Sequence, residues 1–127
     1  MKRLLLVDDN SLFREAFALL LEWNMGLDSV QAESAAEARR ILGDSHDEVG
    51  LAIIDIDLPD GDGIELIEEL RETETDIPVL ALATGRRPQH IRALQAGAEE
   101  VLTVEEPIEE LVDTVRRLLA GGVPARG

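Results

Sequence analysis

Five short apolar runs alternate with longer segments of helical periodicity, and this alternation constrains the fold of the chain more than any other feature. The runs are residues 3–7 (RLLLV), 28–32 (DSVQA), 51–55 (LAIID), 78–82 (PVLAL) and 100–104 (EVLTV). Near-continuous apolar runs such as LLLV and LAII are typical of parallel strands, which are covered on both faces. The alternation predicts βαβ units, and therefore an α/β domain with a parallel sheet between two layers of helices.

The segments between the runs carry the signals of helices. Helical spacing of apolar residues predicts helices over residues 12–23, 34–42, 64–70, 88–96 and 107–120. Ser34 and Glu37 form a capping box at the start of the second, and Gly43 is expected just past its end. Pro107 fits the first position of the fifth helix, whose acidic first turn and basic last turn suit the helix dipole.

Charge and composition exclude several classes of function. The 127 residues include 27 acidic and 12 basic side chains, a formal net charge of −15, and no cysteine. Disulfides and thiolate metal sites are therefore excluded. A strongly acidic surface repels nucleic acid and anionic lipid, so we expect no direct contact with either. No apolar run approaches the length of a membrane span, and the start MKRLLLVDDN reaches aspartates too soon for a signal peptide, so we expect a cytoplasmic location. Residues 1–120 are expected to form one domain, and residues 121–127 (GGVPARG) a linker or a frayed tail.

Aspartates gather at the ends of two predicted strands. Asp8 and Asp9 follow the first strand, and Asp55 ends the third. In an open α/β sheet of strand order 2-1-3-4-5 these two strands are neighbours, so the three carboxylates should converge where ligands bind. Oxygen ligands of high negative charge suit Mg²⁺, and an aspartate carboxylate is a competent nucleophile toward phosphorus. For Asp8 or Asp9 taken alone, a role in capping the following helix would be the better interpretation; Asp55 at the adjacent strand end favours the shared site instead.

Three motifs together resemble a response-regulator receiver domain, from Arg3 to about Ala120: LLLVDDN, AIIDIDLPDGDG and ALQAGAEEVL. The resemblance implies a flavodoxin-like, doubly wound five-stranded sheet and a role in two-component phosphorelay signalling. It implies that Asp55 is the phosphoacceptor, and that Asp8, Asp9 and Asp55 hold Mg²⁺ with the backbone carbonyl of Asp57.

The same resemblance implies partners. A histidine kinase would be the phosphodonor. The signal would pass to an effector domain or protein through the face of the fourth helix, fifth strand and fifth helix, and homodimerisation stays open. The stretch DDNSLFREAFALLLE is also similar to receivers that precede a helix-turn-helix DNA-binding domain.

Three positions depart from the pattern of the family. Ala83 stands where a hydroxyl residue belongs, Val101 replaces an aromatic residue, and Val104 replaces a lysine. No realignment supplies the lysine, because Lys2 is the only one in the chain. Phosphorylation adds about −1.5 to −2 charge, which needs donors or cations to order a structure. We therefore expect altered switching chemistry.

Substitutes for the missing groups are available in the loop after the fourth strand. Thr84, Arg86 and Arg87 are candidate contacts for phosphoryl oxygens, since a guanidinium can bind them bidentately. The alternative is that both arginines are solvated surface residues.

Two other functions remain as alternatives. One is a pseudo-receiver, a protein-interaction module independent of phosphorylation; the three departures favour it and the intact acidic cluster opposes it. The other is a phosphatase, because DID after an apolar strand also resembles the nucleophile motif of haloacid-dehalogenase-type enzymes. Here the motif lies on the third strand and no lysine follows it, so we expect that the chain is not an enzyme.

Overall fold

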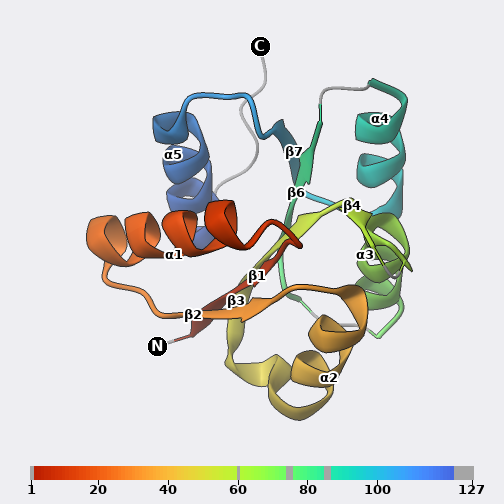
Figure 1. The fold of residues 1–127 in the computed structure, drawn as a ribbon. Helices are drawn as coiled ribbons and strands as arrows, with labels where there is room; N and C mark the ends of the chain where they lie inside the picture. The colour runs from red at the N-terminus through yellow and green to blue at the C-terminus, as the bar shows by residue number, and fades with distance from the viewer. Residues whose placement is uncertain (1, 60, 74–75, 85–86, 122–127) are drawn as a thin grey trace.

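The fold is one five-stranded parallel sheet between two layers of helices (Figure 1). The computed structural model describes residues 2–59, 61–73, 76–84 and 87–121. The strand order is β2-β1-β3-β6-β7, which is the predicted order 2-1-3-4-5 when the five strands of this sheet are counted along the chain. The predicted fold class is confirmed.

The elements follow one another as the alternating pattern predicts. The strands of the main sheet are β1 (Arg3–Val7), β2 (Ser29–Ala32), β3 (Val49–Asp55), β6 (Val79–Ala83) and β7 (Glu100–Thr103). The helices are α1 (Ser11–Met25), α2 (Ala35–Ser45), α3 (Gly63–Glu72), α4 (Arg87–Ala96) and α5 (Ile108–Leu119), with a short 3₁₀ turn η1 (His46–Glu48). Two further strands, β4 (Asp57–Leu58) and β5 (Gly61–Asp62), pair antiparallel in the loop after β3.

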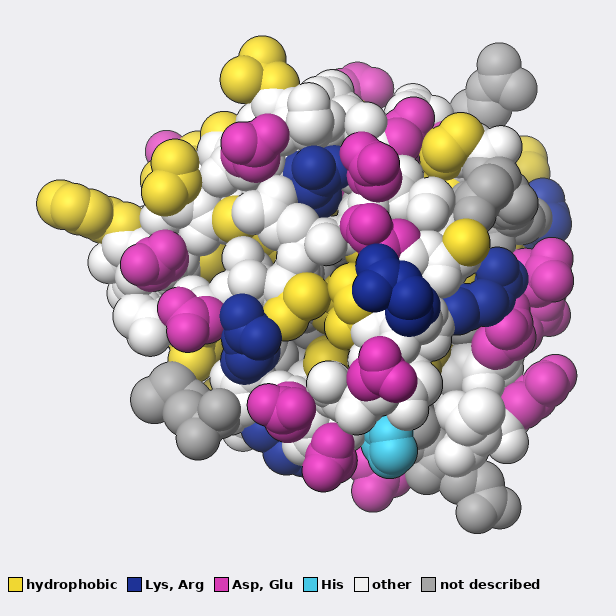
Figure 2. Space-filling model, turned by 60° about the horizontal axis from the view of Figure 1, so that its bottom comes forward, with side chains coloured by type: hydrophobic (Ala, Val, Ile, Leu, Met, Phe, Trp, Pro, Cys, Tyr) yellow, Lys and Arg dark blue, Asp and Glu magenta, His cyan; other side chains and the backbone are white. Residues whose placement is uncertain are grey.

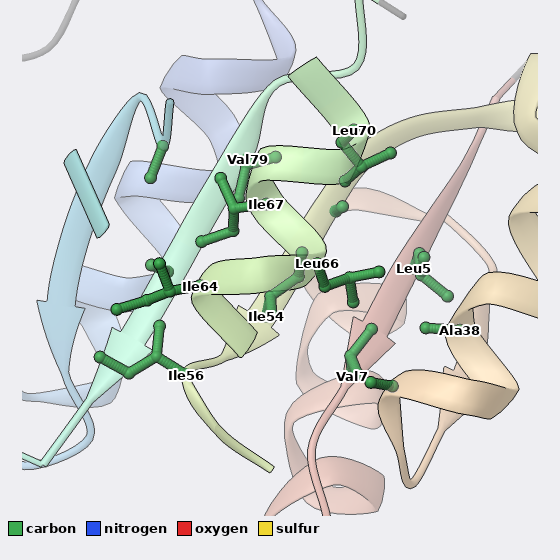
Figure 3. Close-up of a cluster of buried hydrophobic side chains, with 14 of the residues drawn as sticks. Leu5, Val7, Ala38, Ile54, Ile56, Ile64, Leu66, Ile67, Leu70 and Val79 are labelled. Atoms are coloured by element: carbon green, nitrogen blue, oxygen red, sulfur yellow. The ribbon is translucent and has the colours of Figure 1, made fainter. Parts of the chain in front are cut away.

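Side chains on successive strand positions point to opposite faces, so each strand serves two cores. Leu4 and Leu6 of β1 pack with α1 and α5, where Phe17 and Leu111 are fully buried. Leu5 and Val7 point the other way, into the cluster drawn in Figure 3. That cluster is covered by α2, α3 and α4. This two-sided burial is why the strands are apolar at consecutive positions.

Several predicted boundaries are wrong. Gly43 lies inside α2, which continues to Ser45 and passes directly into η1. Pro107 precedes α5 as its N-cap with ψ 142°, so the helix begins one residue later. Strand β3 begins at Val49, earlier than expected, because that residue pairs with Arg3 at the start of β1. The proposed tail falls largely outside the described residues, since only its first residue is placed.

The surface agrees with the acidic composition. On the face shown in Figure 2, acidic side chains are spread across the molecule with basic ones between them. Within the described part of the chain, no helix combines the length and apolar character that crossing a bilayer requires.

Candidate functional site

The three aspartates singled out from the sequence meet at the carboxyl edge of the sheet. Strands β1 and β3 pair in parallel with Val7 opposite Ile54, so Asp8 and Asp55 leave the sheet side by side. One carboxylate oxygen from each of Asp8, Asp9 and Asp55 lies within 4.8 Å of the others. Asp8 is buried, Asp55 is partly buried and Asp9 is exposed. We call this group the acidic cup.

Backbone amides and one arginine hold the acidic cup in place. The amide of Asn10 donates to Asp8 Oδ1 at 2.9 Å, and the amide of Asp57 donates to Asp55 Oδ1 at 2.9 Å. Arg14 Nη1 donates to the backbone carbonyl of Asp8 at 2.6 Å. The N-cap of α1 is Asn10, whose side chain accepts from the amide of Phe13. Asp8 and Asp9 are therefore not the N-cap of α1, because Asn10 caps this helix.

Burial and crowding perturb the two inner carboxyl groups. Burial raises the pKa of Asp55 from 3.8 to about 7; the Asp57 amide opposes this, and the charges of Asp8, Asp9 and Asp57 add to it. Burial also raises the pKa of Asp8, against the Asn10 amide. Because burial and the neighbouring charges disfavour the carboxylate form, a pKa of about 7 leaves Asp55 partly protonated near neutral pH.

A glycine fixes the loop that carries Asp55. A Cβ on Gly63 would lie 2.3 Å from the carbonyl oxygen of Asp55 and 2.6 Å from Cα of Ile56. The Gly63 amide donates to the Ile56 carbonyl at 3.1 Å. The first residue of α3 therefore packs directly on the backbone beside the cup, where only glycine fits.

The three switch positions offer no polar side chain to the site. Ala83 ends β6 and is 1% exposed. Val101 is partly buried against the core, and Val104 is 38% exposed, with its amide donating to the Ala83 carbonyl at 3.0 Å. Lys2 lies beside Gly50, near the opposite end of the strands from the acidic cup. The lysine that the sequence lacks is therefore not replaced by Lys2.

Two residues, one in the loop after β6 and one in the first turn of α4, contact the side chain of Asp57, which lies next to the acidic cup. Thr84 is exposed, and its Oγ1 donates to Asp57 Oδ2 at 3.4 Å. Gln89 Nε2 donates to Asp57 Oδ1 at 3.5 Å. Asp57, Gln89 and Arg92 share the lining of a hollow of about 360 Å³. Sequence reasoning missed Gln89, because nothing in the chain pattern shows which residue of α4 faces the β3–α3 loop.

The structure does not describe the side chains of the two candidate arginines. Arg86 lies outside the described residues, and Arg87 begins α4 but its side chain is among those not described. Their contact with a phosphoryl group stays a prediction.

Comparisons with known proteins agree with this geometry. The sequence model of the response regulator receiver domain family matches residues 4–116 of this chain. Response regulator MprA of Mycobacterium sp. (strain KMS) is 31% identical over 98% of this chain and 54% of its own length. Virulence transcriptional regulatory protein PhoP of Salmonella typhimurium is 33% identical over 94% of this chain and 52% of its own. The chain thus spans about half the length of these relatives.

Solved structures show the same fold. The structure of a two-component response regulator, LuxR family, from Aurantimonas sp. SI85-9A1 superimposes with a TM-score of 0.86 at 28% identity, covering 95% of this chain and 86% of that one. The Francisella response regulator 1452 receiver domain gives a TM-score of 0.85 at 25% identity, covering 95% and 98%. The chain belongs to the response-regulator receiver domain family of two-component phosphorelay signalling.

Proposed function

We propose that Asp55 accepts a phosphoryl group from a histidine kinase, and that the acidic cup holds Mg²⁺ together with the backbone carbonyl of Asp57. The observation that carries this is the approach of three carboxylates to within 4.8 Å at the ends of two neighbouring strands. Hard oxygen donors with several negative charges are the ligand set of Mg²⁺. The raised pKa of Asp55 supports the same proposal, because burial and, to a smaller extent, the neighbouring carboxylates disfavour its charged form, which a bound cation would stabilise.

The chain orients its own nucleophile. Asp55 Oδ1 is occupied by the Asp57 amide, which leaves Oδ2 as the attacking atom. Where Asp55 is protonated, it must first lose that proton to water, since the carboxylate and not the acid is nucleophilic. A bond then forms between Oδ2 and phosphorus as the nitrogen–phosphorus bond of the donor phosphohistidine breaks. Bound Mg²⁺ would supply positive charge to the carboxylates and to the phosphoryl oxygens.

We propose that output passes through the face formed by α4, β7 and α5. Apolar side chains lie exposed there: Ile91 is 55% exposed, Leu94 50% and Val104 38%. Such a surface suits an effector domain, an effector protein or a second copy of the chain. The net charge of −15 supports the absence of direct contact with nucleic acid or membrane, and the family role supports a cytoplasmic location.

Mass spectrometry after treatment with acetyl phosphate and Mg²⁺ tests the proposal. The wild-type chain should gain one phosphoryl group, Asp55→Asn should gain none, and omission of Mg²⁺ should reduce the yield. An unmodified wild-type chain under these conditions would contradict phosphoacceptance.

A second candidate is a pseudo-receiver that binds its partner without phosphorylation. The observation that favours it is the absence of polar side chains at Ala83, Val101 and Val104. It predicts no mass increment, with partner binding unchanged in Asp55→Asn. In either case we propose that the chain is not an enzyme with a substrate of its own; sustained hydrolysis of a chromogenic phosphate ester would contradict this.

A further inference from the structure

A phosphoryl group on Asp55 would need hydrogen-bond donors that the switch positions do not supply. Ala83 is apolar and buried, Val104 is apolar, and Lys2 lies near the other end of the strands. The group carries about −1.5 to −2 charge and three acceptor oxygens, so donors must come from elsewhere in the chain. The described residues show two side-chain donors that meet the loop carrying Asp55 from the β6–α4 side.

Both donors are held by the carboxylate of Asp57. Thr84 Oγ1 lies 3.4 Å from Oδ2 and Gln89 Nε2 lies 3.5 Å from Oδ1. Asp57 is in turn tied to the phosphoacceptor, since its amide donates to Asp55 Oδ1 at 2.9 Å. Gln89 is therefore linked to Asp55 through a single intervening residue.

The geometry points to Gln89 as a phosphoryl-oxygen donor that acts with Thr84 in place of the missing lysine and hydroxyl. This inference rests on the proposed phosphorylation of Asp55. The amide of Gln89 is a neutral donor, so it would stabilise the phosphoryl group by a directed hydrogen bond and not by charge.

The resting contacts are weak enough for the donors to move. Separations of 3.4 and 3.5 Å are at the long end for hydrogen bonds. Gln89 Oε1 is buried, and no donor within the described part of the chain reaches it. The amide is thus held in its resting position by one long hydrogen bond. A hollow of about 360 Å³, lined by Asp57 and Gln89 among others, leaves room for a change of rotamer.

Phosphorylation favours this movement in two ways. A dianionic phosphoryl oxygen is a stronger acceptor than a solvated carboxylate. Its charge also repels the carboxylate of Asp57, which weakens the resting contacts. Gln89 lies on the same helix as the exposed Ile91 and Leu94, so its new contact with the phosphoryl group would be made by the helix that contributes to the proposed output face.

Binding of beryllofluoride, a phosphoryl mimic, in the presence of Mg²⁺ tests this role. We expect Gln89→Leu to weaken that binding about tenfold or more, as loss of a hydrogen bond to a charged group does. Gln95→Leu is the matched control, because Gln95 is an exposed glutamine six positions further along α4. It should leave the affinity unchanged. Equal affinity in wild type and Gln89→Leu would overturn the inference.

A second background separates direct contact from an effect through Asp57. If Gln89 acts only by holding the Asp57 side chain, Gln89→Leu should no longer weaken beryllofluoride binding once that side chain is removed by Asp57→Ala. If Gln89 binds the phosphoryl oxygens, Gln89→Leu should still weaken beryllofluoride binding in the Asp57→Ala background, which keeps the backbone carbonyl. Equal affinity of Asp57→Ala with and without Gln89→Leu would therefore also overturn the inference.

The outcome is distinguishable from failure of the proposed function. A wild-type chain that neither binds beryllofluoride with Mg²⁺ nor gains mass from acetyl phosphate contradicts phosphoacceptance itself, and the inference falls with it. A wild-type chain that does both, beside a Gln89→Leu variant with the same affinity and the same lifetime of the acyl phosphate, contradicts the role of Gln89 alone.

Discussion

Replacing Asp55 by asparagine should stabilise the metal-free protein, by an amount that grows with pH. Burial and the charges of Asp8, Asp9 and Asp57 raise the pKa of Asp55 from 3.8 to about 7. The folded chain therefore binds this proton more tightly than the unfolded chain. Stability is then lost as pH rises from about 4 through 7, which is the opposite of a salt-bridged aspartate whose pKa is depressed.

The magnitude follows from the two pKa values. Each pH unit between 3.8 and about 7 contributes about 1.4 kcal/mol, so the full penalty is at most about 4 kcal/mol above pH 7. Asp55 is only partly buried, and water and salt screen its charge. We expect Asp55→Asn to raise the free energy of unfolding by about 2 kcal/mol at pH 8, and by little at pH 4.

Urea denaturation in EDTA at several pH values measures this difference. Asp44→Asn is a suitable control, since Asp44 is an exposed residue in the last turn of α2. Its replacement should change stability little at any pH. Added Mg²⁺ should stabilise wild type more than Asp55→Asn, because the cation binds the charged cup of the folded state. A difference between wild type and Asp55→Asn that is absent at pH 8, or constant from pH 4 to 8, would refute the electrostatic reasoning.

Three further outcomes are expected. The affinity for Mg²⁺, measured by calorimetry, should fall between pH 8 and 6, because a proton on Asp55 competes with the cation; a constant affinity would contradict the raised pKa. Gly63→Ala should lower the free energy of unfolding by about 1–3 kcal/mol and reduce phosphorylation, because the added Cβ would lie 2.3 Å from the backbone. In contrast, a Cβ at Gly43 would have no atom within 4 Å, so Gly43→Ala should stabilise α2 by up to about 1 kcal/mol. Leu66→Ala should destabilise by about 2–5 kcal/mol in a urea titration and the exposed Leu19→Ala by much less; equal losses would contradict the assigned core.

The sheet was predictable because its signal lies in consecutive residues. A run such as Leu4 to Val7 has no polar position, and only burial on both faces accommodates that pattern. Once the strands are parallel and covered on both sides, the helices between them must lie in two layers. With the strand order 2-1-3-4-5 of a flavodoxin-like sheet, the convergence of Asp8, Asp9 and Asp55 followed, and the structure confirms both the order and the convergence.

Boundaries depended on interactions that no local pattern records. Gly43 usually signals the end of a helix, but here the chain stays helical because η1 continues the turn into β3. Val49 joins β3 because Arg3 is its partner across the sheet. The antiparallel pair β4 and β5 spans a loop whose composition indicates only turns. Propensity sets the elements, and tertiary pairing sets where they begin and end.

The contacts that support the site could not be predicted from the sequence either. Arg14 lies one turn into α1, and only the packing of that helix brings its guanidinium to the Asp8 carbonyl. Gln89 faces Asp57 because α4 packs against α3 at the edge of the β3–α3 loop. The carboxylates themselves were predictable because strand ends fix their position, whereas a helix can present any of several side chains to a neighbouring loop.

The unusual donor set limits how strongly phosphorylation can bias the fold. The crowded carboxylates destabilise the folded state of the metal-free protein. A cation that binds only the folded state relieves this repulsion and stabilises that state. A phosphoryl group on Asp55 would then depend on the cation and on the proposed neutral donors Thr84 and Gln89, since Val104 supplies no ammonium. A neutral hydrogen bond contributes less than a charge-assisted pair. A ligand shifts a two-state equilibrium only by its differential free energy, so phosphorylation should produce a smaller population shift here than in receivers that keep the lysine.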